Sequence, residues 1–261
     1  MIIVYSRSAS ATFPTTNLTG RWDFSDITSL YKTFTDINNP CYTVQATADG
    51  DLIAVAVSQY PTPTSEWTLH NGASPTLRLT SPLLGTQCLD FDGVNDNLTM
   101  GARAGGSRAI SNLFAVGGKT CAISFRCESL PATGELQPML VSKNNFNCGV
   151  YVYNPSGTAK ILANNNDGSY DNCIGDTVVV DTNYVAVMRH DGSNLYVSLN
   201  GGSETSAASG NTASLSETTA MGFAGSGQFY NGRIGEVLTY NAALTGTDLS
   251  NLITYMTNKW L

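Results

Sequence analysis

Residues 121–127 read Cys-Ala-Ile-Ser-Phe-Arg-Cys, and this stretch alternates between two kinds of side chain. In an extended chain successive side chains point to opposite faces, so the cysteines, Ile123 and Phe125 share one face. The residues between them, Ala122, Ser124 and Arg126, share the other. An alternation of this length predicts a β-strand with its apolar face buried and its second face outward.

A β-hairpin is predicted from residues 184–190 and 194–199. Asp191-Gly192 lies between these two runs, and this pair supplies the positive φ that a tight β-turn requires. Asn200-Gly201-Gly202 provides the next turn in the same way.

Further short runs of strand character recur along the chain, separated by turn residues. They lie at residues 87–92, 136–142, 149–153, 160–163, 177–180, 219–224 and 233–240. The Ser-, Thr- and Ala-rich segment 201–219 predicts a weak edge strand and a loop. This spacing of strands and turns is typical of two antiparallel sheets packed as a sandwich, so the fold class is all-β.

A C-terminal segment departs from the β pattern. Leu249, Leu252, Ile253, Met256 and Trp260 recur at helical spacing. Thr245 precedes them at an N-cap position and Asp248 follows three residues later, as in a capping box. We therefore expect an amphipathic helix over residues 245–259 that docks on the sandwich.

The composition excludes several classes of function. Charged residues make up only 13% of the 261 residues, and the formal net charge is −7. Nucleic-acid binding needs clustered cations, which this chain lacks, so no nucleic-acid partner is expected. The sequence contains no apolar stretch of about 20 residues, and no membrane partner is expected. The N-terminus does not resemble a secretory signal, since a basic residue does not precede its short apolar run.

The N-terminus is expected to be an attachment segment. Residues 1–17 form an arm without strand or helix period, and residues 18–261 form the folded domain. The arm begins with Ile2, Ile3, Val4 and Tyr5, apolar residues with no local core to join. These four residues are candidate assembly contacts, either to other proteins of a particle or to neighbouring copies of this chain.

Six cysteines are distributed without a CxxC pair or a Cys/His group, so a zinc site is not expected. Most of them are expected to be buried thiols. Cys148 and Cys173 are the first pair to consider for a disulfide.

Several segments, taken in chain order, resemble the concanavalin A-like (laminin-G-like) family. The segments are Leu89-Asp90-Phe91-Asp92-Gly93-Val94-Asn95-Asp96-Asn97-Leu98, residues 120–128, residues 184–201, and Gly232-Arg233-Ile234-Gly235-Glu236-Val237-Leu238-Thr239-Tyr240-Asn241-Ala242-Ala243-Leu244. Arg21-Trp22-Asp23 resembles an opening strand, and the C-terminal helix resembles versions found in bacterial and phage surface proteins. The resemblance covers residues 18–261 and implies a two-sheet antiparallel jelly-roll sandwich. Lectins, adhesion modules, glycan hydrolases and lyases, and viral surface proteins use this fold, so the fold alone leaves the function open.

An enzymatic function is not expected. A retaining glycosidase needs two carboxylates about 5–5.5 Å apart, whereas the glutamates of this chain are isolated from one another. The two histidines, His70 and His190, have no partner set, and His190 is expected at a surface turn. We therefore predict no catalytic residues.

Asp90, Asp92 and Asp96 are candidate calcium ligands, because hard cations prefer carboxylate oxygens. The alternative is that Asp92-Gly93 and Asn95-Asp96 only form a turn. No other cofactor is expected.

Two amide-rich segments are candidate glycan-binding loops. They supply planar amides, carboxylates and an aromatic ring, which are the groups that hold sugars. The candidate residues are Asn145, Phe146, Asn165, Tyr170 and Asp171. The alternative is that these residues fill turns for conformational reasons.

These observations favour a non-catalytic virion surface protein of bacteriophage type, such as a capsid decoration or fibre component, that contacts host cell-surface glycans. The missing signal, the low charge and the phage-like version of the family support this hypothesis. The alternative is a bacterial extracellular carbohydrate-binding or adhesion module located outside the cell or on its surface.

Overall fold

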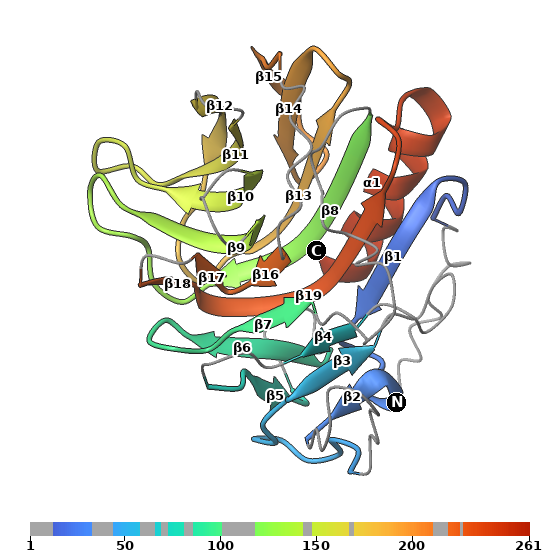
Figure 1. Cartoon of the computed structure of the whole chain (residues 1–261), viewed down its shortest axis with the longest axis vertical. Helices are drawn as coiled ribbons and strands as arrows, with labels where there is room; N and C mark the ends of the chain where they lie inside the picture. The colour runs from blue at the N-terminus through green and yellow to red at the C-terminus, as the bar shows by residue number, and fades with distance from the viewer. Residues whose placement is uncertain are drawn as a thin grey trace, which may run out of the picture.

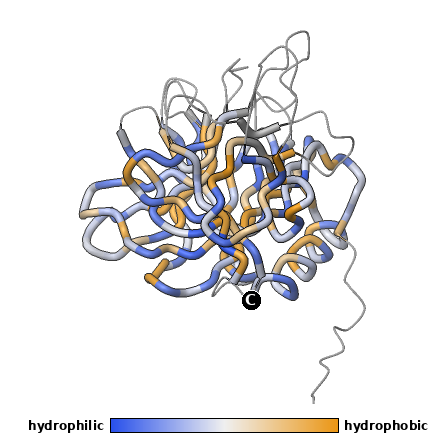
Figure 2. The backbone as a smooth tube through the Cα atoms, turned by 90° about the horizontal axis from the view of Figure 1, so that it is seen from below, coloured by the Kyte–Doolittle hydropathy of each residue, from blue (hydrophilic) through white to orange (hydrophobic). Residues whose placement is uncertain are grey.

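The computed structural model describes residues 13–32, 44–57, 66–68, 73–80, 86–100, 118–142, 148–166, 170–210, 219–224 and 227–261. They form a two-sheet antiparallel β-sandwich with one α-helix near the C-terminus, which confirms the predicted fold class (Figure 1). Hydrophobic and hydrophilic segments are interspersed along the described chain (Figure 2). None of the described helices is long and apolar enough to cross a membrane.

The first sheet has eight strands arranged around the long strand β19. Its order is β15-β14-β13-β8-β19-β6-β5, and β1 also pairs with β19, beyond the end of β6. The strands are β1 (Leu18–Asp23), β5 (Thr76–Arg78), β6 (Cys88–Asp92), β8 (Lys119–Cys127), β13 (Asn183–His190), β14 (Asn194–Leu199), β15 (Thr205–Ala208) and β19 (Asn231–Tyr240).

The second sheet has nine strands in the order β12-β11-β10-β9-β16-β7-β4-β3-β2. They are β2 (Leu30–Tyr31), β3 (Val55–Val57), β4 (Glu66–Thr68), β7 (Leu98–Met100), β9 (Leu136–Ser142), β10 (Cys148–Tyr153), β11 (Lys160–Asn166), β12 (Tyr170–Thr177) and β16 (Thr219–Met221). A small hairpin of β17 (Phe223–Ala224) and β18 (Gln228–Phe229) follows β16, and a 3-10 turn, η1 (Ile27–Ser29), follows β1.

The main core lies between the two sheets. The alternate residues of β8, from Cys121 through Ile123 and Phe125 to Cys127, are all buried in this core, as the sequence predicted. The hairpin of β13 and β14 is also confirmed, with Gly192 at a φ of 98° in its turn.

A second apolar layer lies between the first sheet and helix α1 (Gly246–Trp260). In Figure 1, α1 and strands β9–β12 flank β8 and β13 on opposite sides. Leu252 and Met256 of the helix pack over Ala122, so the predicted docking is confirmed. Ala122 and Ser124 face away from the main core as predicted, but the helix layer buries them completely. Thr245 takes the N-cap position, but its side chain makes no capping hydrogen bond.

A buried carboxylate, Glu236, holds the C-terminal end of α1 against the sheet. Its side chain is fully buried and accepts hydrogen bonds from Arg21 Nε (2.8 Å), Tyr255 Oη (2.9 Å), Lys259 Nζ (2.8 Å) and Trp260 Nε1 (2.9 Å). The preceding Gly235 has no side chain, and a Cβ there would lie 2.3 Å from the Trp260 ring. The Gly-Glu pair therefore lets the indole lie directly on β19.

His190 occupies a buried position, and the prediction of a surface turn residue is wrong. It is the last residue of β13, where Ser209 covers it: Nε2 donates to the Ser209 carbonyl (3.2 Å), and Nδ1 accepts from Gly192 N (3.2 Å). Both ring nitrogens are thus satisfied by the backbone.

The cysteines that the structure describes, Cys88, Cys121, Cys127, Cys148 and Cys173, are all free buried thiols. The candidate disulfide between Cys148 and Cys173 does not form. Strand β11 lies between β10 and β12, so these two strands are about 9.5 Å apart, and the two cysteines are also offset along them, beyond the reach of a disulfide. Cys148 donates to Asn165 Oδ1 and Cys173 to the Thr205 carbonyl instead.

Two strand boundaries in this region also differ from prediction. Strand β12 covers residues 170–177, whereas the sequence predicted a strand at 177–180. Strand β11 extends to Asn166, so Asn164–Asn166, Tyr170 and Asp171 belong to paired strands rather than to a loop.

Candidate functional site

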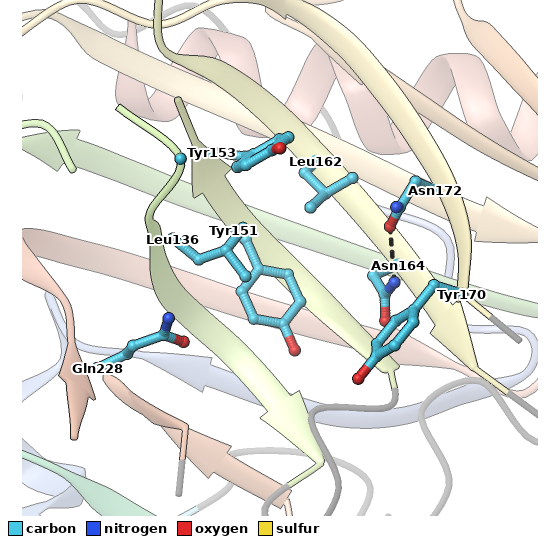
Figure 3. Close-up of a pocket in the computed structure, with 9 residues that line it drawn as sticks. Leu136, Tyr151, Tyr153, Leu162, Asn164, Tyr170, Asn172 and Gln228 are labelled. Carbon is cyan, nitrogen blue, oxygen red and sulfur yellow. Dashed lines mark hydrogen bonds between the residues drawn. The ribbon is translucent and has the colours of Figure 1, made fainter. Parts of the chain in front are cut away.

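A pocket of about 380 Å³ opens on the outer face of the second sheet, over strands β9 to β12 (Figure 3). Tyrosine, leucine and amide side chains dominate its lining. The described lining residues are Gly134, Leu136, Tyr151, Tyr153, Leu162, Asn164, Tyr170, Asn172 and Gln228.

The pleat of the sheet explains why these residues gather on one face. In β10, Val150 and Val152 point into the main core, so Tyr151 and Tyr153 point outward. Ile161 and Ala163 of β11 also enter the core, and Leu162 and Asn164 alternate with them. Cys173 of β12 faces inward in the same way, and Tyr170 and Asn172 lie outward.

The floor of the pocket is apolar and its rim carries an exposed ring. Tyr151 and Leu162 are 1% and 3% exposed, and both belong to an apolar cluster on the outer face of the sheet. Burial raises the pKa of the Tyr151 phenol, so this side chain stays neutral. Tyr170 is 63% exposed at the rim. In Figure 3 the hydroxyl ends of Tyr151 and Tyr170 extend toward the same side of the pocket.

Amide groups supply the polar contacts of the pocket. Asn164 and Asn172 are cross-strand partners, and Asn164 Nδ2 donates to Asn172 Oδ1 at 2.7 Å. This bond orients the two planar groups beside Tyr170 (Figure 3). On the opposite side Gln228, from the β17–β18 hairpin, places its Oε1 in a buried position where the described structure offers no hydrogen-bond partner. Because this oxygen is buried, a ligand can reach it only if the Gln228 side chain rotates toward the pocket.

The described lining residues include no charged side chain and no histidine. Stacking surfaces next to planar amides are the means by which a protein holds a neutral, hydroxyl-rich ring. The arrangement is therefore suited to a sugar.

The structure divides the predicted glycan-binding residues between two faces. Tyr170 lines the pocket. Asn165 and Asp171, a cross-strand pair, lie on the opposite face of their strands, where Asn165 is fully buried and donates to Ser209 Oγ (2.8 Å). Asn165 is therefore not exposed to a ligand in this structure. Asn145 and Phe146 lie outside the described residues.

Sequence reasoning missed most of the pocket. Tyr151 and Tyr153 alternate with valines in Gly-Val-Tyr-Val-Tyr (residues 149–153), a pattern that could have indicated a tyrosine-bearing face. Asn164 and Asn172 were part of amide-rich stretches, but only the strand register selects them. No local sequence signal indicates Gln228.

The candidate calcium ligands are used within the protein. Asp92 Oδ1 accepts from Val94 N (2.8 Å) and Asn95 N (3.1 Å), and Asp96 Oδ2 accepts from Asp92 N (3.0 Å). Asp90 accepts from Arg78 Nε at 2.7 Å. These bonds match the turn interpretation. Within the described residues, no three His, Cys, Asp or Glu side chains come together as a metal site.

The assembly candidates Ile2, Ile3, Val4 and Tyr5 lie outside the described residues. The described part of the arm begins at Phe13, whose ring lies 4.9 Å from that of Tyr255 and contacts Arg21. The arm thus enters the fold on the helix-bearing side of the first sheet.

No family model matches the chain, and no curated protein matches it in sequence. Among solved structures, Trypanosoma rangeli sialidase is similar with a TM-score of 0.57 and 14% identity, over 93% of this chain and 33% of the sialidase chain. The chain therefore spans about a third of that protein. Domain 4 of AbnA, a GH43 extracellular arabinanase from Geobacillus stearothermophilus in complex with arabinotriose, gives a TM-score of 0.48 at 13% identity, over 94% of this chain and 98% of that domain.

Tailspike protein 2 of Escherichia coli O157:H7 bacteriophage CAB120 gives a TM-score of 0.49 at 13% identity, over 70% of this chain and 26% of the tailspike. At these identities the likeness concerns the fold alone. The likeness to the sialidase agrees with the β-sandwich fold of the chain.

Proposed function

We propose that this chain is a carbohydrate-binding domain that holds a glycan in the pocket over β9–β12 without turning it over. The observation that carries the proposal is the convergence of three tyrosines and three amides on one pocket whose described lining carries no charge. An exposed ring such as Tyr170 stacks on the apolar face of a sugar, and the amides bind its hydroxyls.

The chemistry of the lining supports binding rather than catalysis. Hydrolysis or elimination needs an acid and a base aimed at one bond. The described lining offers phenols and amides, and burial keeps the Tyr151 phenol protonated. Three glutamates with described side chains are paired away from the pocket: Glu128 with Arg233, Glu204 with Arg189, and Glu236 with Arg21 and Lys259.

We further propose membership of the concanavalin A-like family and a setting outside the cell, on a virion surface or as a bacterial extracellular module. Shallow sugar sites bind weakly one at a time, and many copies on one particle increase the overall affinity. Immunogold electron microscopy of the source particle and of the source cell surface distinguishes the two settings.

The test of binding is a glycan array probed with the whole chain and with Tyr170→Ala. We expect Tyr170→Ala to lose about fivefold in affinity, because stacking contributes of the order of 1 kcal/mol. Ile174→Ala is the matched control, since Ile174 lies on the same strand and face but outside the pocket lining. Equal loss in both variants, or no binding of any glycan by the whole chain presented in many copies, contradicts the proposal.

A further inference from the structure

We infer that the pocket selects neutral glycans and rejects acidic ones, which rests on the proposed function and specifies its ligand class. The described lining consists of tyrosine, leucine, asparagine, glutamine and glycine, and none of these side chains carries a positive charge. A carboxylate, sulfate or phosphate on the ligand would find no cation among these residues, because the nearest one on this face, Lys160, lies beside Tyr153 and outside the described lining.

Because the floor of the pocket is apolar, binding an anion there without a cationic partner is unfavourable. An anion that enters would leave water and lie against Tyr151 and Leu162, which are almost completely buried. Removing a charge from water without a compensating partner is unfavourable, and the apolar surroundings offer little dielectric screening. The overall charge of −7 adds a repulsive background.

The polar groups that face the pocket also match hydroxyls better than anions. The buried Oε1 of Gln228 is an acceptor without a partner in the described structure, so the ligand group that meets it has to donate a hydrogen bond. A hydroxyl donates and accepts, and it can satisfy the oxygen or the nitrogen of an amide. A carboxylate only accepts, so it would repel this oxygen.

The inferred ligand class differs from the sugar that a structural relative binds. The sialidase is known in complex with sialic acid, an acidic sugar. Recognition of such a sugar needs cationic groups of the kind that bind carboxylates in a bidentate way. The described lining residues of this chain include no such group.

The experiment compares one polysaccharide in two charge states. Chondroitin and its carboxyl-reduced derivative share linkage and length, and the reduction converts each uronic acid into a neutral hexose. Both are printed on an array together with neutral and sialylated oligosaccharides, and the whole chain is applied in a multivalent form. We expect every glycan that binds above background to be neutral. We also expect any carboxyl-reduced probe that binds to exceed its acidic parent by at least about tenfold.

Two further measurements keep the outcome decisive. The affinity for the strongest binder should be unchanged between low and high salt, since a neutral ligand has no charge to screen. Asn172→Arg places a cation at an exposed position on the rim, and it should move the preference toward the acidic probes. Preferential binding of acidic glycans by the unaltered chain, lost in Tyr170→Ala, would overturn the inference and leave the proposed function intact. Binding of neither class would overturn both.

Discussion

Replacement of Glu236 by glutamine tests whether one carboxylate fixes helix α1 to the first sheet. Glu236 Oε1 accepts from Arg21 and Tyr255, and Oε2 accepts from Lys259 and Trp260. A glutamine has the same shape but only one acceptor oxygen. Its amide nitrogen would therefore face either Arg21 and Tyr255 or Lys259 and Trp260, all of which are donors in this cluster.

The magnitude follows from the donors that lose their acceptor. A buried donor without an acceptor costs about 1–3 kcal/mol, and removal of one partner from a buried ion pair costs about 3–5 kcal/mol. Asp23 still contacts both cations, and both remain partly exposed, which lowers the cost. We expect Glu236→Gln to reduce the free energy of unfolding by about 3 kcal/mol, or to lower the Tm by about 6–12 °C.

Urea denaturation measures this change, with an unaltered m-value as evidence that the folded state remains compact. Glu204→Gln is the matched control, because Glu204 forms two bonds to Arg189 (2.7 and 2.6 Å) at the surface. Exposed ion pairs contribute about 1 kcal/mol or less, so the control should cost far less. Equal losses in the two variants would refute the reasoning that burial makes the Glu236 cluster decisive.

Three further outcomes are expected. Leu252→Ala should reduce the free energy of unfolding by about 2–5 kcal/mol, because Leu252 is fully buried between α1 and the first sheet, and an unchanged urea midpoint would contradict this packing. Burial raises the pKa of Asp96 to about 6 from 3.8, so the folded state holds a proton that the unfolded chain has already released, and stability falls as the pH rises between these values. Asp96→Asn should abolish that fall, and parallel Tm–pH curves for the two proteins would argue against it. Deletion of residues 1–12, which spares Phe13, should leave the Tm unchanged but prevent co-sedimentation with the source particle, and continued co-sedimentation would argue against an attachment role.

The sequence predicted the strands of the central sheet well because their burial is local and periodic. Cys121–Cys127 alternates strictly, and both turns that follow the β13 and β14 strands contain residues with positive φ, including Gly192 and Gly201. It did not predict that the second face of β8 is also buried. Ala122 and Ser124 are compatible with solvent and with a tight helix–sheet contact, and only the position of α1 decides between them.

The burial of polar residues was predicted less well than that of apolar ones, because the sequence does not show which groups will form hydrogen bonds with them. His190 and Asn165 both read as surface residues, yet each is buried against Ser209. Ser209 follows β15, the edge strand that closes this corner of the sandwich. A buried polar group is tolerated when its partners are supplied from elsewhere in the fold, and that condition is a tertiary one.

The pocket residues were also difficult to predict, because they come together only through the pairing of the strands. A search along the chain selects residues that are neighbours in sequence, such as Tyr170 and Asp171, whereas the face of a sheet collects every second residue from adjacent strands. A shift of register by one residue would exchange Tyr170 and Asn172 for Asp171 and Cys173. The inward position of Cys173 could have set the register of β12 from the sequence, because a cysteine is far more often buried than an asparagine. Gln228 could not have been found in this way, since the β17–β18 hairpin reaches the pocket through its contact with β9, a distant part of the chain.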